Sequence, residues 1–285
     1  MFGQHTINTM QKTFKQYQKE ARIKWTILAI LFLFTGLFLL VEITFNLLNI
    51  PLTISVIFGS IALLTGLIIQ IINTFYIRER ISITALFPEM IAQHKQFNEI
   101  AYEYIPYAKE YKNLFKESGL FTRNAFARVR YAIKGTTNDG DAFILLNLSL
   151  IVSSGSASTE IFRGILYQIT KKNEANMQIK TRYRPTLKGV KFEKTNEEAP
   201  FKIYQEVGNT NETNSKQYFH KIKQLHHQLN AKHTYFSTTE DAHYFAFTAP
   251  SIPYKMRTVN ETEVNKVLDT FKTYLELPNE LTNTI

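Results

Sequence analysis

A glutamate and an arginine stand three residues apart, at Glu160 and Arg163, in a segment that ends at Gly164. A carboxylate and a guanidinium at this spacing can form an ion pair across a bend in a strand, and the glycine allows a β-bulge there. The sequence leaves two interpretations open for this segment, a structural corner or one wall of a binding site.

A basic stretch follows this segment and has two aromatic residues inside it. Its members are Lys171, Lys172, Lys180, Arg182, Arg184, Lys188, Lys191 and Lys194. Such a density of cations is typical of contacts to lipid headgroups or nucleic acid. Exposed strand faces and loops show the same pattern, and nearby glutamates lower the local charge, which favours this second interpretation. The candidate surface or ligand contacts are Glu160, Arg163, Lys180, Arg182 and Arg184.

Two further patterns could hold a metal or move a proton. Asp139 and Asp141 flank Gly140, which is the ordinary composition of a turn. The histidines between residues 220 and 243 lack both a glutamate in the predicted helix and the HExxH spacing, so a solvated helix face is favoured over a zinc site. The chain has no cysteine and no phosphate-binding or dinucleotide motif. We therefore expect no metal and no cofactor.

Two long apolar segments precede all of these residues. Apart from Glu42, residues 25–77 contain no charged side chain. Because a membrane span needs about 20 apolar residues, the sequence predicts a transmembrane hairpin with spans over about 25–45 and 51–76. Glu42 is interpreted as a residue of the outer interface, in preference to a functional carboxylate inside the membrane.

The first 24 residues are polar and basic with apolar residues at helical spacing. They predict either an amphipathic helix on the membrane surface or a helical extension of the first span. In the second span, Gly59, Ala62 and Gly66 provide small residues that would let the first span approach closely. The weaker alternative is a homo-oligomer contact through the same face.

The distribution of basic residues predicts the orientation. Five lysines and arginines lie within residues 12–24, none lies between the spans, and Arg78 and Arg80 follow the second span. Positive charge stays on the cytoplasmic side, so both termini are expected there. The formal net charge is +9, and its concentration near the apolar segments favours anionic lipid headgroups over nucleic acid as the partner.

Residues 78–285 are predicted to form an α+β domain in which antiparallel strands are flanked by helices. An apolar stripe predicts helices over 81–117, and alternating patterns predict mainly strands over 125–207. Residues 216–275 are predicted to form a helix, a hairpin and a final helix.

Two short motifs carry a resemblance. They are Glu117-Ser118-Gly119-Leu120-Phe121 and Thr159-Glu160-Ile161-Phe162-Arg163-Gly164-Ile165-Leu166. With the basic leader and the paired spans, this layout resembles a bacterial family of membrane-anchored proteins known as domain of unknown function 3137. The resemblance covers most of the chain. It implies a bacterial plasma membrane protein and carries over no catalytic residues.

The sequence therefore predicts a membrane-anchored, non-enzymatic binding or scaffold module. Its cytoplasmic domain would engage a protein partner or the membrane surface. The alternative is an enzyme that acts on a membrane-proximal lipid or phosphate ester. That alternative requires a concave pocket joining Glu160, Arg163 and the basic residues of the following strands.

Overall fold

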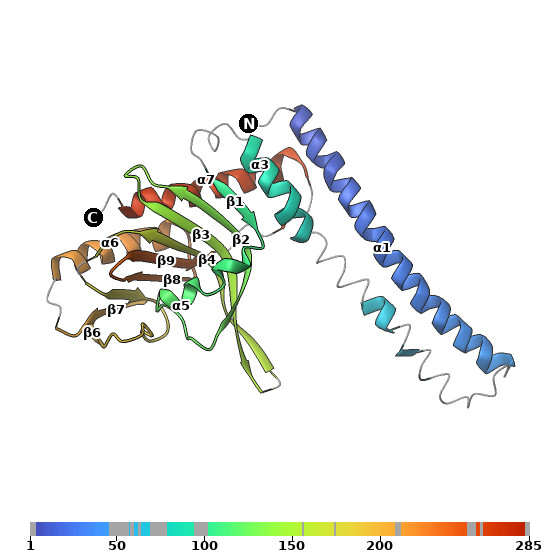
Figure 1. Cartoon of the computed structure of the whole chain (residues 1–285), viewed down its shortest axis with the longest axis horizontal. Coiled ribbons are helices and arrows are strands. Elements are labelled where there is room, and N and C mark those ends of the chain that lie inside the picture. Colours follow the sequence, from blue (N-terminus) through green and yellow to red (C-terminus); the bar gives the residue numbers. More distant parts are fainter. Residues whose placement is uncertain are drawn as a thin grey trace. The chain divides into compact units, whose positions relative to one another are not determined.

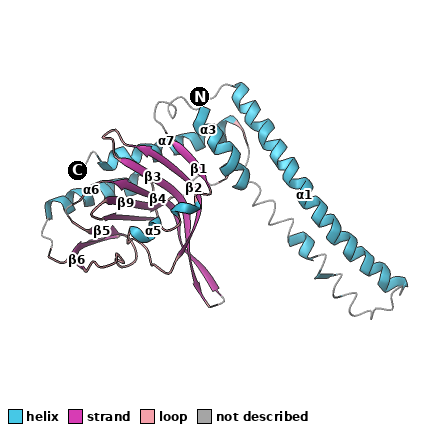
Figure 2. Ribbon diagram, in the orientation of Figure 1, coloured by secondary structure: helices cyan, strands magenta, loops and turns pink. Residues whose placement is uncertain are grey.

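The computed structural model describes residues 4–45, 57, 60–61, 64–68, 79–93, 102–155, 157–173, 175–208, 212–249, 255–256 and 259–282. The chain divides into two compact units. The first comprises Met1–Phe87 with Lys255–Val264, and the second comprises Pro88–Tyr254 with Asn265–Ile285. The first unit is helical where it is described, and the second contains the sheet (Figure 2).

The described helices are α1 (Gln4–Phe45), the π-helical η1 (Ser82–Leu86), α3 (Phe87–Gln93), the 3-10 turn η2 (Lys109–Tyr111), α5 (Leu114–Glu117), α6 (Glu212–Gln228) and α7 (Glu261–Thr282). The described strands are β1 (Glu103–Pro106), β2 (Phe126–Thr136), β3 (Ala142–Ser154), β4 (Ala157–Thr170), β5 (Met177–Lys180), β6 (Phe192–Glu198), β7 (Phe201–Glu206), β8 (His233–Thr238) and β9 (Ala242–Thr248).

α1 is one continuous helix of 42 residues, so the basic leader is a helical extension of the first apolar segment. Its first turns belong to the interior of the protein. Ile7, Met10 and Phe14 are buried, and Gln11 Nε2 donates a hydrogen bond to the Val259 carbonyl at 2.7 Å. These three apolar side chains are therefore not available to lie on a membrane surface.

A second helical segment, residues 64–68, lies against α1. A Cβ built on Gly66 would stand 3.4 Å from the Cβ of Phe32, which is ordinary van der Waals contact. The small residue thus permits the close approach that its spacing predicts. The other two small residues of the pattern, Gly59 and Ala62, lie outside the described residues.

The two predicted membrane spans are not confirmed by the structure. Within the described ranges, no helix is both long enough and apolar enough to cross a membrane. Most of the second predicted span, residues 51–76, lies outside those ranges, and so does the side chain of Glu42.

The second unit is an α+β domain, as predicted. Nine strands form one sheet in the order β1-β2-β3-β4-β9-β8-β5-β7-β6. Every pairing in this sheet is antiparallel. The order brings the C-terminal hairpin, β8 and β9, between β4 and β5, so strands that are distant in sequence form the middle of the sheet (Figure 1).

Helices cover one face of the sheet. Tyr167 of β4 donates a hydrogen bond to the Tyr274 carbonyl of α7 at 2.9 Å. Tyr218 of α6 packs against Phe236 of β8 with ring centroids 4.9 Å apart. Since side chains alternate across a strand, the neighbours of Phe236 on β8 face the opposite side.

The opposite face is covered by α5 and the segment that follows it. Phe121 packs against Phe162 and Tyr235, with ring centroids 4.7 and 5.0 Å apart. These residues belong to a buried apolar cluster that also contains Leu114 and Phe115 of α5. The sheet therefore has a hydrophobic core on each face.

The prediction of helix through residues 81–117 is wrong for residues 103–106, which form the edge strand β1. Tyr104 pairs with Ile133 of β2, and its ring stacks on Tyr131 with centroids 5.4 Å apart. Pairing with a strand far along the chain overrides the local helical pattern. Pro106 ends this edge strand, a position where its missing N–H is tolerated.

The hairpin of β3 and β4 extends beyond both of its neighbours in the sheet. β2 pairs with β3 only as far as Ile151, and β9 pairs with β4 only from Ile165 onward. Among the described residues, 152–154 therefore pair with 157–159 and with no third strand, whereas 160–164 pair with β3 and have no strand on their other side. We name residues 152–155 and 157–164 the β3–β4 arm. Figure 1 shows this arm projecting beyond the other strands.

Candidate functional site

Glu160 and Arg163 lie at the base of the β3–β4 arm and form the ion pair that their spacing predicts. Arg163 Nε and Nη2 donate hydrogen bonds to Glu160 Oε2 at 3.1 and 2.9 Å. A register shift against β3 makes Ile161 an extra residue in β4, which is a β-bulge. Both charged side chains are substantially exposed, so this pair contributes at most about 1 kcal/mol to stability.

Gly164 ends this segment at a very close approach of two backbones. A Cβ built on Gly164 would lie 2.1 Å from the carbonyl oxygen of Phe247 in β9 and 2.6 Å from Phe162 Cζ. The position therefore requires glycine, because no other residue fits between β4 and β9 here.

Lys180 is fully buried at the end of β5. Its Nζ donates hydrogen bonds to the main-chain carbonyls of Gly119 at 3.2 Å and Arg184 at 3.0 Å. Desolvation of the ammonium lowers the pKa of Lys180 to about 7. A substantial fraction of this side chain is therefore a neutral amine near neutral pH, the form that acts as a base or nucleophile.

Thr186 reinforces the same connection. Its Oγ1 lies 2.9 Å from the Gly119 carbonyl oxygen and 2.6 Å from that of Phe121, which share its single hydrogen, and its N–H donates to the Gly119 carbonyl at 3.2 Å. Lys180 and Thr186 together hold the segment around Gly119 to the loop after β5. We name Lys180, Thr186, Gly119 and Phe121 the Lys180 clasp. The arrangement restrains two loops and closes the lysine off from solvent.

Buried polar side chains lie beside the clasp on the same face of the sheet. Gln178 is directly opposite Ser237, and Lys180 is directly opposite Tyr235, across the β5–β8 pairing. Both amide atoms of Gln178, the Tyr235 hydroxyl and Ser237 Oγ are buried and have no hydrogen-bond partner in the described part of the chain. Native proteins contain few such groups, because each costs about 1–3 kcal/mol.

Tyr183 connects the two candidate segments. Its hydroxyl donates to the Ile161 carbonyl in the bulge at 3.1 Å, and its ring stacks on Tyr235. The guanidinium of Arg182 lies 5.0 Å from the centre of the Tyr183 ring. The predicted residues thus come from adjoining segments, but they do not share one surface: Arg182 and Arg184 are exposed, whereas Lys180 is buried.

The prediction of exposed strand faces for the basic stretch is therefore wrong at Lys180. β5 lies inside the sheet between β8 and β7, so both of its edges are paired. The side chain extends under the loops of the clasp, where a long apolar stem can be buried while its amine reaches carbonyls.

The interpretation of the histidines between residues 220 and 243 as a solvated helix face is wrong for His243, which lies in β9 and is buried on the helix-covered face of the sheet. His243 Nε2 hydrogen-bonds the Asn173 side-chain oxygen and lies 3.3 Å from the Tyr218 hydroxyl. The amide nitrogen of Asn173 donates to the carbonyls of Lys171 and Thr239, so its oxygen must accept from a protonated Nε2. Burial lowers the pKa of His243 to about 4, and Lys171 adds to this effect. His243 is therefore a neutral structural histidine.

No group of three or more histidines, aspartates and glutamates converges as metal ligands within the described ranges. His220 and His227 are exposed on α6, as expected for a solvated helix face. Asp139 and Asp141 lie in the turn between β2 and β3, where the Thr137 N–H donates to the Asp141 carbonyl at 2.8 Å. This geometry fits their interpretation as turn residues.

Comparison of the chain with protein-family models, curated proteins and solved structures finds no match. The resemblance to domain of unknown function 3137 therefore stays a prediction, and the function must be inferred from the chain itself.

Proposed function

We propose that this chain is a membrane-anchored, non-enzymatic binding module whose α+β domain engages a protein partner. One observation carries the proposal: large apolar side chains are exposed along α1 in an almost continuous series. They are Ile23, Ile27, Ile30, Leu31, Phe34, Leu37, Phe38 and Val41. Phe34, the most exposed of them, has 66% of its surface accessible.

Water is an unfavourable solvent for such a surface. Each Å² of apolar surface removed from water contributes about 25 cal/mol, and folded proteins in water seldom expose long apolar patches. The sequence supports a hydrocarbon environment, since residues 25–41 contain no charged residue. The helical segment around Gly66 is also apolar and exposed, with Leu64, Leu67 and Ile68 each more than half accessible. Two such helices in contact are the elements of a membrane hairpin.

The orientation of this anchor follows from the basic residues. Lysines and arginines lie before residue 25 and directly after residue 77. Under the positive-inside rule both termini and the α+β domain are cytoplasmic. The same cations would face the anionic headgroups of a bacterial plasma membrane, the location that the family resemblance implies.

The β3–β4 arm is the surface best suited to a protein partner. Residues 153–155 and 157–160 are exposed, and each strand of the arm has one edge that no third strand covers in the described part of the chain. An uncovered strand edge presents unpaired N–H and C=O groups, to which an extended segment of another chain can add as a further strand. The serines of the arm leave that backbone accessible.

A single cysteine at the tip of the arm should report on which side of the membrane the domain lies. Ser154 is exposed and the chain has no cysteine, so Ser154→Cys introduces one reporter thiol. We expect no labelling of intact cells by a membrane-impermeant maleimide and full labelling once the membrane is opened. The protein should also remain in the membrane pellet after alkaline extraction.

The unsubstituted chain is the control for labelling at sites other than the thiol. Release into the alkaline supernatant would contradict membrane anchoring. Immediate labelling of intact cells would contradict the cytoplasmic location while leaving the anchor in place.

Binding through the arm predicts a position-dependent crosslink. A photo-crosslinking residue at Ser158 should give one discrete adduct in intact cells, whereas the same residue at Lys172 should not. Both positions are exposed, and only Ser158 lies in the arm. Electrophoresis followed by mass spectrometry would detect and identify the adduct. The same adducts from both positions, or none from Ser158, would contradict binding through the arm.

The buried amine of Lys180 is the observation that favours the alternative, an enzyme acting on a membrane-proximal ester. That function needs a pocket joining Glu160 and Arg163 to the basic residues. The Glu160–Arg163 pair is exposed and Lys180 is closed off, so among the described residues these groups do not share one surface. The binding module is therefore the better-supported function.

A further inference from the structure

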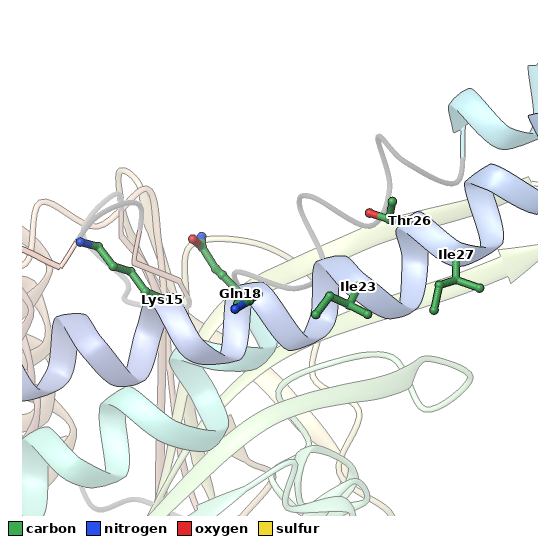
Figure 3. A pocket seen from close by; sticks show the side chains of 6 residues that line it. Lys15, Gln18, Ile23, Thr26 and Ile27 are labelled. Carbon is green, nitrogen blue, oxygen red and sulfur yellow. The ribbon is translucent and has the colours of Figure 1, made fainter.

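α1 carries a groove at the point where its sequence changes from basic to apolar. The groove has a volume of about 410 Å³, and the described residues that line it are Lys15, Gln18, Lys19, Ile23, Thr26 and Ile27. Figure 3 shows the lining side chains following one another along the helix, with Lys15 at one end and Ile27 at the other. This volume is within the range of small-molecule binding sites.

The spacing of the lining residues places unlike chemistry at the two ends of one helix face. Lys15, Lys19, Ile23 and Ile27 recur every four residues, so they form one row along α1. Two ammonium groups occupy the first part of the row and two isoleucines the second. At about 1.5 Å per residue, the row extends over roughly 18 Å.

This profile is complementary to one class of molecule. A phospholipid has a phosphate at one end and an acyl chain that begins a short distance away. Lys15 and Lys19 supply the positive charge for the phosphate, and Ile23 and Ile27 supply an apolar surface for the chain. The side chains of Gln18 and Thr26 add polar groups between these ends.

The local charges favour a lipid with net negative charge. The nearest carboxylate on this part of α1, Glu20, accepts a hydrogen bond from Gln16 Nε2 at 3.2 Å, and neither residue lines the groove. The cationic headgroup of a zwitterionic lipid would be repelled by the two lysines, whereas that of phosphatidylglycerol would not.

We propose that the α1 groove binds an anionic phospholipid, with its phosphate at Lys15 and Lys19 and its acyl chain along Ile23 and Ile27. The proposal rests on the proposed function, because the lipid can reach the groove only if α1 enters a membrane.

The single tryptophan of the chain provides the test. Trp25 belongs to α1 and stands between Ile23 and Ile27 in the sequence. The full-length protein would be reconstituted in phosphatidylcholine vesicles that contain one brominated lipid, either phosphatidylglycerol or phosphatidylcholine, at the same mole fraction. In both lipids the bromine is on the acyl chain near the headgroup. Bromine quenches tryptophan fluorescence only at short range. We expect brominated phosphatidylglycerol to quench Trp25 fluorescence roughly threefold more than brominated phosphatidylcholine does.

The double variant Lys15→Gln with Lys19→Gln should make quenching by the two brominated lipids equal. The matched control is Lys188→Gln with Lys191→Gln, which removes the same charge from exposed positions of the second unit and should keep the preference. Circular dichroism of each variant would verify that its fold is unchanged.

The quenching results distinguish the lipid site from the membrane anchor. Equal quenching of the unsubstituted chain by both lipids would overturn the lipid site and leave membrane anchoring intact. A preference that survives in the Lys15 and Lys19 variant would also overturn the site. No quenching by either lipid would show that Trp25 is outside the bilayer and would overturn the anchor as well.

Discussion

Replacing Gly164 by alanine should lower the free energy of unfolding of the α+β domain by roughly 3 kcal/mol. The added Cβ would stand 2.1 Å from the Phe247 carbonyl oxygen and 2.6 Å from Phe162 Cζ. The first of these atoms belongs to the backbone of β9, so it cannot move without separating β9 from β4. Urea-induced unfolding of the full chain in detergent, followed by far-ultraviolet circular dichroism, would measure the loss.

Gly155→Asn is the matched control for this prediction. No described residue lies within 4 Å of a Cβ built on Gly155, and its φ of 59° lies in the left-handed region that asparagine tolerates. The free energy of unfolding of the Gly155→Asn variant should change by no more than about a few tenths of a kcal/mol. Unchanged stability of the Gly164 variant would mean that β4 and β9 do not approach this closely.

The second large effect is on the pH dependence of stability. Lys180 has a pKa of about 7 in the folded chain, against an ordinary value of 10.5. Between these values the unfolded chain binds a proton that the folded chain does not, so stability rises with pH. We expect the free energy of unfolding to increase by roughly 3 kcal/mol between about pH 7 and pH 9.5.

The rise in the free energy of unfolding ends near pH 9.5, because buried tyrosines lower the stability as the pH increases further. Burial raises the pKa of Tyr244 to about 12, so above its ordinary value of 10.0 the unfolded chain loses a proton that the folded chain keeps. Stability then falls with increasing pH.

Lys180→Met should abolish most of the rise between pH 7 and pH 9.5, because the variant has no amine to titrate. Lys202→Met is the control: Lys202 is directly opposite Lys180 across the β5–β7 pairing but is exposed. The Lys202→Met variant should show the same rise in the free energy of unfolding as the unsubstituted chain. Urea unfolding at a series of pH values would measure both variants, and a rise that persists without Lys180 would refute its assignment to this residue.

Elements with a strong local signal could be predicted from the sequence. Alternating residues over 159–170 predict a strand, and β4 is Ala157–Thr170. The hairpin of β8 and β9 follows from two apolar runs around a short polar turn, and an apolar helical stripe predicts the core of α7. The Glu160–Arg163 pair belongs to the same class, because its two members are three residues apart.

Features that depend on strand order could not be predicted. β1 forms only because β2 lies beside it, whereas the local apolar pattern of residues 103–106 favours a helix. Lys180 is buried because the segment at Gly119 and the loop after β5 cover its side chain, and Gly119 lies 61 positions away in the chain. The same applies to His243, whose partner Asn173 lies on a distant loop.

The strand order also has a consequence for how the protein is made. Ile165 of β4 pairs with Phe247 of β9, so one edge of β4 has no partner until about 80 further residues have been synthesised. At about 5–20 residues per second, this delay is on the order of ten seconds. During that time β2, β3 and β4 can already form a sheet with an open apolar edge, the kind of edge that recruits other strands. A nascent chain of this protein should therefore depend on chaperones until the hairpin of β8 and β9 emerges from the ribosome.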